Sequence, residues 1–167
     1  MTTQIFFNGL LSFATLTTIL VTGLLFTFAL LVMPGLGQLD DREFLRGFQE
    51  IDRIIQHSHP LFVVVWLGSI LGLLAACALG YGQLEEWPRG LLIAATVLFI
   101  IGVQLPTFRG NVPLNNKLQT LELTSMDTSD LAEARQAFEP KWNRLNVFRT
   151  LISVVVSILL IIVVLLR

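Results

Sequence analysis

The stretch VFRTLISVVVSILLIIVVLL, residues 147–166, decides the fold class. Its one charged side chain, Arg149, lies close to the start of the run. A helix needs about 20 mostly apolar residues to cross the hydrocarbon core of a bilayer. The stretch therefore predicts a transmembrane helix, because a helix in lipid satisfies its backbone hydrogen bonds internally.

Three further apolar stretches precede it, at residues 6–33, 61–80 and 88–105. The chain is 54% hydrophobic, and its apolar residues collect in these blocks instead of the short runs of a soluble domain. We expect an all-α fold with a single domain over residues 1–167. It should be a four-helix transmembrane bundle with short amphipathic helices in its two long loops.

The basic residues predict the orientation of the spans. Nine of the eleven lysines and arginines lie in the segments 34–60 and 106–149. Positively charged loops stay on the cytoplasmic side. We therefore expect a multi-pass protein of a bacterial inner membrane, with both long loops cytoplasmic and both termini outside. The net charge of -1 gives no indication of a nucleic-acid partner.

The first long loop contains an amphipathic segment at residues 42–57. Phe44 and Phe48 recur on one face of it, and polar residues recur on another. Asp40 or Asp41 can cap this helix, because a carboxylate accepts hydrogen bonds from the free N–H groups of a first turn.

Prolines mark the expected helix ends. Pro34 should end the first helix and Pro106 the third, since proline lacks a backbone N–H and clashes with the preceding turn. Pro113 suits the first turn of a short helix. Pro140 should interrupt one helix and open the long final one.

Small residues repeat at a spacing of four in the second span, at Gly68, Gly72, Ala76 and Gly80. This pattern lets another helix approach closely. It can serve packing within the chain, or contact with a membrane partner or a second copy in a homo-oligomer. The sequence leaves both uses open.

Polar residues form one stripe along the last helix, at Trp142, Asn146, Arg149, Ser153 and Ser157. Polar groups that face lipid are costly, so such a stripe usually faces the bundle interior. One interpretation is that it lines a pocket open to the cytoplasm. The other is that Arg149 and Trp142 are ordinary residues of the membrane interface.

Three asparagines follow the third span, at positions 111, 115 and 116. Asn111 can cap the short helix that follows it. Asn115 and Asn116 come after the cap and are poor helix formers, so they need another reason to be there. Contacts with Asn146, Arg149 or a ligand would supply one.

His57 and His59 are the remaining candidates for chemistry. In an extended chain before Pro60 both imidazoles would point to the same side and can bind one metal ion. A third ligand, such as Asp52, would have to join them, and no complete metal site is visible. No cofactor is evident.

The sequence lacks a P-loop, a dinucleotide-binding fingerprint and a nucleophile elbow. No charged residue lies in the middle of any predicted span. This argues against an ion pump, a proton relay or a voltage sensor.

Several short motifs of this chain are typical of one family of membrane proteins. They are Thr22-Gly23, Met33-Pro34-Gly35-Leu36, Phe48-Gln49-Glu50-Ile51-Asp52, Asn111-Val112-Pro113-Leu114-Asn115, and Trp142 with Asn146 and Arg149. Through them, and over nearly its whole length, the chain resembles a family of small four-helix membrane proteins whose few characterised members are anthrone oxygenases. The resemblance implies oxidation of an aromatic anthrone to a quinone by molecular oxygen, without an evident cofactor. It carries over no catalytic residues, and position 52, which is Asp here, is often asparagine in such proteins.

Two functions follow as hypotheses. In the first, an oxidoreductase takes a lipophilic aromatic or quinone-like molecule from the bilayer. His57 or His59 acts as base, Arg149 stabilises the enolate and Trp142 packs on the ring. The substrate-binding candidates are Asn111, Asn115, Asn116, Trp142, Asn146 and Asp52. In the second, the protein is a non-enzymatic binder of lipid or quinone, or an accessory subunit of a membrane complex.

Overall fold

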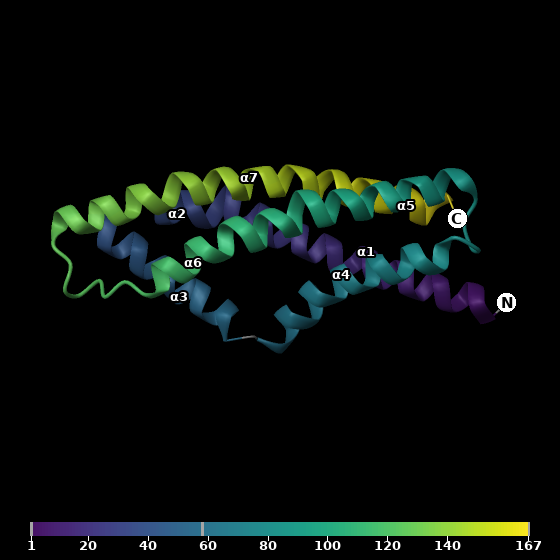
Figure 1. The fold of residues 1–167 in the computed structure, drawn as a ribbon, viewed down its shortest axis with the longest axis horizontal. Coiled ribbons are helices and arrows are strands. Elements are labelled where there is room, and N and C mark those ends of the chain that lie inside the picture. Colours follow the sequence, from purple (N-terminus) through teal and green to yellow (C-terminus); the bar gives the residue numbers. More distant parts are fainter. Residues whose placement is uncertain (1, 58, 167) are drawn as a thin grey trace.

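The computed structural model describes residues 2–57 and 59–166, and this part of the chain is almost entirely helical (Figure 1). Three of the segments, labelled η, are wider π-helical turns within longer helices. In chain order the elements are α1 (Thr2–Thr27), η1 (Phe28–Val32), α2 (Met33–Leu36), α3 (Asp41–Gln56), α4 (Pro60–Gly80), α5 (Glu86–Leu98), η2 (Phe99–Gln104), η3 (Thr107–Asn111), α6 (Val112–Gln119) and α7 (Thr128–Leu166).

Four helical segments are long and apolar enough to cross a membrane: Thr2–Leu36, Pro60–Gly80, Glu86–Gln119 and Thr128–Leu166. The predicted fold class, all-α with four candidate spans, is confirmed. Helix α1 begins and α7 ends at the same end of the elongated molecule (right of Figure 1). A chain that crosses a membrane four times has both of its ends on the same side.

The third and fourth candidate spans are longer than the sequence predicted, because the helices continue through prolines that were expected to mark helix ends. The chain stays helical through Pro106 and Pro113, and α7 contains Pro140 in its interior. Proline removes one helical hydrogen bond, and π-helical turns on both sides of Pro106 change the hydrogen-bond ladder there. The separate helices expected in the second long loop are thus extensions of these two spans.

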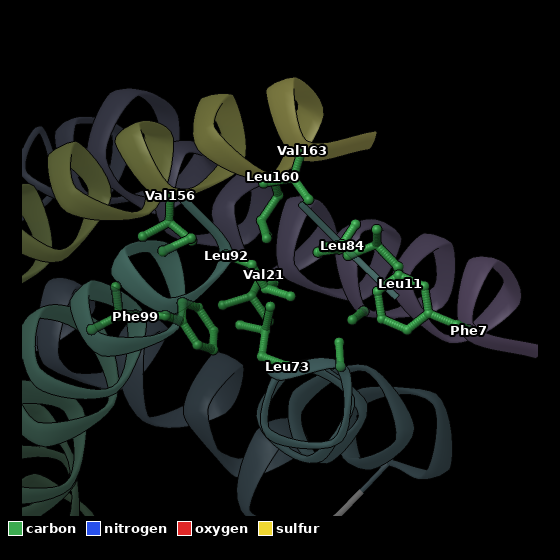
Figure 2. Close-up of a cluster of buried hydrophobic side chains, with 14 of the residues drawn as sticks. Phe7, Leu11, Val21, Leu73, Leu84, Leu92, Phe99, Val156, Leu160 and Val163 are labelled. Carbon is green, nitrogen blue, oxygen red and sulfur yellow. The ribbon is translucent and has the colours of Figure 1, made fainter. Parts of the chain in front are cut away.

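The membrane core lies between α1, α4, α5 and α7 (Figure 2). Helix α1 packs against both α4 and α7, and α5 packs against α7. The largest fully buried side chains of this core include Phe7, Leu11, Leu73, Leu92 and Phe99. Many other large apolar residues of the spans are exposed on the outer surface, as expected of helices that face lipid.

The small-residue stripe of α4 lies against α1. A Cβ added to Gly72 would lie 3.1 Å from the Cβ of Ala14, and one added to Gly68 would lie 2.9 Å from the ring of Phe13. Ala76 is fully buried. Of the two uses left open by the sequence, packing within the chain occurs here, and a partner would have to displace α1 to reach this stripe.

A second layer, made of α3, α6 and the first turns of α7, extends the bundle at the left of Figure 1. Phe48 joins its aromatic cluster, with ring centroids 4.7 Å from Phe138 and 5.3 Å from Trp142. The side chain of Gln49 donates to the carbonyl of Leu118 at 2.8 Å. Apolar packing and side-chain hydrogen bonds thus hold α3 beside α6 and α7.

Arg135 of α7 fixes the turn that leads into α3. Its guanidinium pairs with Asp41 at 3.1 Å and with Glu139 at 2.7 Å. It also donates to the carbonyls of Gly37 and Leu39. These bonds tie the turn before α3 to α7.

Caps define the starts of α3 and α7. The carboxylate of Asp40 accepts a hydrogen bond from the N–H of Glu43 at 2.8 Å, which confirms one of the two predicted caps of α3. Asp127 accepts from the N–H of Asp130 and from the hydroxyl of Ser129 just before α7. These two hydrogen bonds lower the pKa of the Asp127 carboxyl.

Candidate functional site

A cavity of about 220 Å³ lies where the second layer meets the membrane core. A dry cavity of about 150 Å³ already binds benzene in another protein, so this space suits an aromatic ligand. Its wall is mostly apolar and aromatic. The lining residues are Leu24, Leu25, Phe28, Phe48, Asp52, Ile55, Phe62, Trp66, Thr107, Phe108, Asn111, Val112, Asn115, Trp142, Asn146 and Arg149.

One side of the cavity reaches the outer surface of the bundle. Phe108 and Val112 line it and are 56% and 36% exposed. Phe62 and Trp66 of α4 also line the cavity, and their rings stack with centroids 5.4 Å apart. These residues belong to candidate spans with exposed apolar side chains, so this side of the cavity meets an apolar outer surface.

Arg149 supplies the positive charge of the cavity and is 3% exposed. Its guanidinium donates to the hydroxyl of Thr107 at 2.8 Å and to the amide oxygen of Asn146 at 2.9 Å. In residues 2–57 and 59–166 its Nε has no hydrogen-bond partner, and no acidic side chain pairs with it. Both hydrogen-bond partners are neutral. They therefore orient the guanidinium group but do not neutralise its charge.

Two asparagines extend this polar wall. Asn146 donates to the carbonyl of Leu25 at 3.1 Å and thereby fixes its amide oxygen toward Arg149. Asn111 is 3% exposed, and its Oδ1 has no partner. Its amide makes only a long contact, 3.5 Å, to the carbonyl of Trp142. A buried unsatisfied acceptor is costly and is expected where a ligand supplies the missing donor.

The cap predicted at Asn111 is wrong. Its backbone is helical, its side chain makes no capping bond, and the helix continues from η3 into α6 without a new start. Asn111 therefore points across the bundle toward α7, as its contact with Trp142 shows.

Asp52 supplies the negative charge and is 2% exposed. Its Oδ1 accepts from the amide of Asn115 at 2.7 Å. Its Oδ2 accepts from the amides of Gln56 at 2.7 Å and Gln119 at 3.0 Å. The oxygen of Asn115 accepts from the indole N–H of Trp142 at 2.9 Å. Asn115 thus links the acid on α3 to the aromatic wall on α7.

Six of the nine residues expected at the site line this one cavity: Asp52, Asn111, Asn115, Trp142, Asn146 and Arg149. Asn116 is exposed and only receives a long hydrogen bond, 3.3 Å, from Gln56.

The two histidines lie elsewhere. His57 and His59 are exposed and line a separate hollow with Arg53 and Pro60. The ring Nδ1 of His57 lies 2.7 Å from the carbonyl oxygen of Arg53. Within the described ranges no three His, Cys, Asp or Glu side chains come together as a metal site would require.

Sequence reasoning missed several residues of the site. Thr107 orients Arg149, and it escaped because the helix was expected to end at Pro106. Gln56 and Gln119 donate hydrogen bonds to Asp52, and Phe62 and Trp66 of α4 line the cavity. Thr107 and Asn111 are four residues apart, but this spacing indicates a shared helix face only if the helix continues past Pro106.

The fold and the site define a class of protein. It is a helical protein with four candidate membrane spans and a cavity lined by one acidic residue and by an arginine that forms no ion pair with it. The sequence profile of the family described as anthrone oxygenase matches residues 53–159. This covers well over half of the chain, which therefore belongs to the anthrone oxygenase family. No curated protein and no solved structure gives a significant match.

Proposed function

We propose that the protein is a membrane oxidoreductase that oxidises a lipophilic aromatic ketone of the anthrone type with molecular oxygen in this cavity. The observation that carries the proposal is Arg149. A buried cation without an acidic partner is costly in an apolar setting, and a ligand that becomes anionic would offset that cost.

The cavity suits both states of such a substrate. The ketone is neutral and apolar, which favours entry from lipid past Phe108 and Val112. Loss of a proton from its methylene carbon gives an enolate with negative charge on oxygen. Arg149 then stabilises this charge inside a site of low dielectric constant, where electrostatic interactions are strong. The aromatic wall, with Trp142 beside Arg149, holds the rings.

The reaction as proposed requires no bound cofactor. The enolate is electron-rich enough to reduce molecular oxygen itself, and the protein contributes binding, proton transfer and charge stabilisation. The hypothesis that His57 or His59 is the base meets a geometric difficulty, because both lie outside the cavity. Turnover by the double variant His57→Ala/His59→Ala would reject that hypothesis.

The test uses the full-length protein in detergent with anthrone as substrate and oxygen uptake as the signal. The wild type should form anthraquinone and consume oxygen. Arg149→Met should lose about 10²–10³-fold in kcat, the usual cost of removing one donor to a developing oxyanion. Arg144→Met is the matched control, because Arg144 is exposed on the same helix.

Failure would be informative. If the wild type binds anthraquinone but oxidises no anthrone, the protein is a binder, as in the second hypothesis. If it does neither, the proposed function is rejected. Equal losses in the Arg144 and Arg149 variants would also contradict the role given to Arg149.

A further inference from the structure

Asp52 is the one acidic side chain among the residues that line the cavity. It lies on the face of α3 that also carries Phe48 and Ile55, and all three line the same space. A carboxylate with 2% exposure needs a strong reason to be there, because burial of a charge is costly unless it is paired or hydrogen-bonded.

The partners of Asp52 keep its charge in place without neutralising it. They are three side-chain amides, from Gln56, Asn115 and Gln119. In the described part of the chain no ion pair includes Asp52, although Arg149 lines the same cavity. The cavity therefore presents one negative and one positive group that do not contact each other.

An ionised carboxylate has about four lone-pair sites for hydrogen bonds. Among the described residues three side-chain amides occupy three of them, which leaves one acceptor site of Asp52 for a ligand. The amides also fix the orientation of the carboxylate, which a proton acceptor needs if it is to meet a carbon acid in a defined geometry.

We propose that Asp52 is the proton acceptor that converts the bound ketone into its enolate. This inference rests on the proposed function and deepens it. It places the base, Asp52, on α3 and Arg149, which stabilises the enolate oxygen, on α7. As the C–H bond breaks, negative charge moves from the carboxylate of Asp52 to the enolate oxygen.

In the first step Asp52 takes a proton from the methylene carbon, and the C–H electron pair moves toward the carbonyl oxygen. Molecular oxygen then accepts electrons from that carbon and forms a C–O bond, and Asp52 returns its proton to the resulting peroxide. Loss of the second C–H proton and cleavage of the O–O bond give a new carbonyl and water. The carbon loses four electrons, and oxygen gains four.

The test separates proton removal from oxidation. Wild-type protein in detergent is incubated with anthrone in D2O without oxygen, and exchange of the methylene protons is followed by NMR against the protein-free rate. We expect catalysed exchange. Asp52→Asn should lower it about 10²–10⁴-fold, the usual contribution of a general base, while anthraquinone still binds.

Glu50→Gln is the matched control, because it makes the same change on the exposed side of α3, where Glu50 pairs with Arg53. It should exchange like the wild type. Asp52→Ala is a second variant in which added formate can occupy the vacated space, and formate should restore exchange. Such rescue would not follow from a purely structural role.

Retention of exchange in Asp52→Asn would overturn the proposal, as would an equal loss in Glu50→Gln or a failure of formate to rescue Asp52→Ala. Wild-type protein that consumes oxygen with anthrone but catalyses no anaerobic exchange would also overturn it, and the proposed function would stand. Wild-type protein that neither binds nor oxidises these probes would reject both.

Discussion

The indole N–H of Trp142 donates to the amide oxygen of Asn115 at 2.9 Å, and this hydrogen bond joins α7 to α6 at the wall of the cavity. The same asparagine donates to Asp52 of α3 at 2.7 Å. One side-chain amide thereby satisfies a buried donor and a buried acceptor on two different helices. Asn115 is thus one of the contacts that hold α3 beside α6 and α7.

Replacement of Asn115 by leucine should destabilise the protein by about 2–4 kcal/mol. It leaves the Trp142 donor without its partner and removes one donor from Asp52, and an unsatisfied buried group costs about 1–3 kcal/mol. Thermal or denaturant unfolding in detergent measures the change. Asn116→Leu is the control, since Asn116 is exposed, and should stay within about 0.5 kcal/mol. Similar losses in both variants would contradict the bridging role of Asn115.

Arg149→Met should change the free energy of unfolding by less than about 1 kcal/mol while it removes activity. The variant loses two hydrogen bonds to neutral groups, and it also removes a buried charge that lacks an acidic partner. Thr107 can still donate to the carbonyl of Val103, which lies 2.6 Å from its hydroxyl. Unfolding curves in detergent measure the stability, and oxygen uptake with anthrone measures the activity. A loss above about 3 kcal/mol would show that Arg149 is mainly structural.

Gly72→Leu should destabilise the bundle by about 1–3 kcal/mol or more, since overpacking forces neighbouring atoms apart. An added Cβ there would meet the Cβ of Ala14 at 3.1 Å and its Cα at 3.2 Å. Gly23→Leu on α1 is the matched control, because a Cβ at Gly23 meets nothing within 4 Å. Unfolding in detergent compares the two. Equal stability would mean that α1 does not pack on this stripe of α4.

Arg135→Ala should lower stability by about 1.5–3 kcal/mol, the range for hydrogen bonds that involve charged groups. The change removes its two ion pairs and its bonds to the carbonyls of Gly37 and Leu39. Because Arg135 ties the turn before α3 to α7, and α3 lines the cavity, the affinity for anthraquinone should fall as well. Titration of the ligand against Trp fluorescence measures it. Unchanged affinity would show that α3 keeps its place without this anchor.

Reporters fused to the C terminus should report an external location. The segments that carry most of the basic residues, 34–60 and 106–149, lie at the opposite end of the molecule from the end of α7. Alkaline phosphatase should therefore be active in a C-terminal fusion, and green fluorescent protein should be dark. The reverse pattern would invert the predicted topology.

Part of the site could be predicted because helical periodicity is local. Trp142, Asn146 and Arg149 share one face of a helix whatever surrounds it, and all three line the cavity. The predictions failed where local rules gave a definite but wrong answer. Pro106 was expected to end a helix, yet wide turns on both sides of it let the helix continue, and Asn111 therefore faces α7 and not a helix start.

The sequence by itself determined that the chain is helical, has four candidate spans, and has its polar residues near the ends of two of them. Apolar length and periodicity are enough for that, because backbone hydrogen bonds and the bilayer act on each helix separately. Only the tertiary structure decided that Asp52 faces the cavity and that His57 and His59 do not. The hydrogen bond from Asn115 to Asp52 joins positions 63 residues apart, and no local periodicity encodes such a contact.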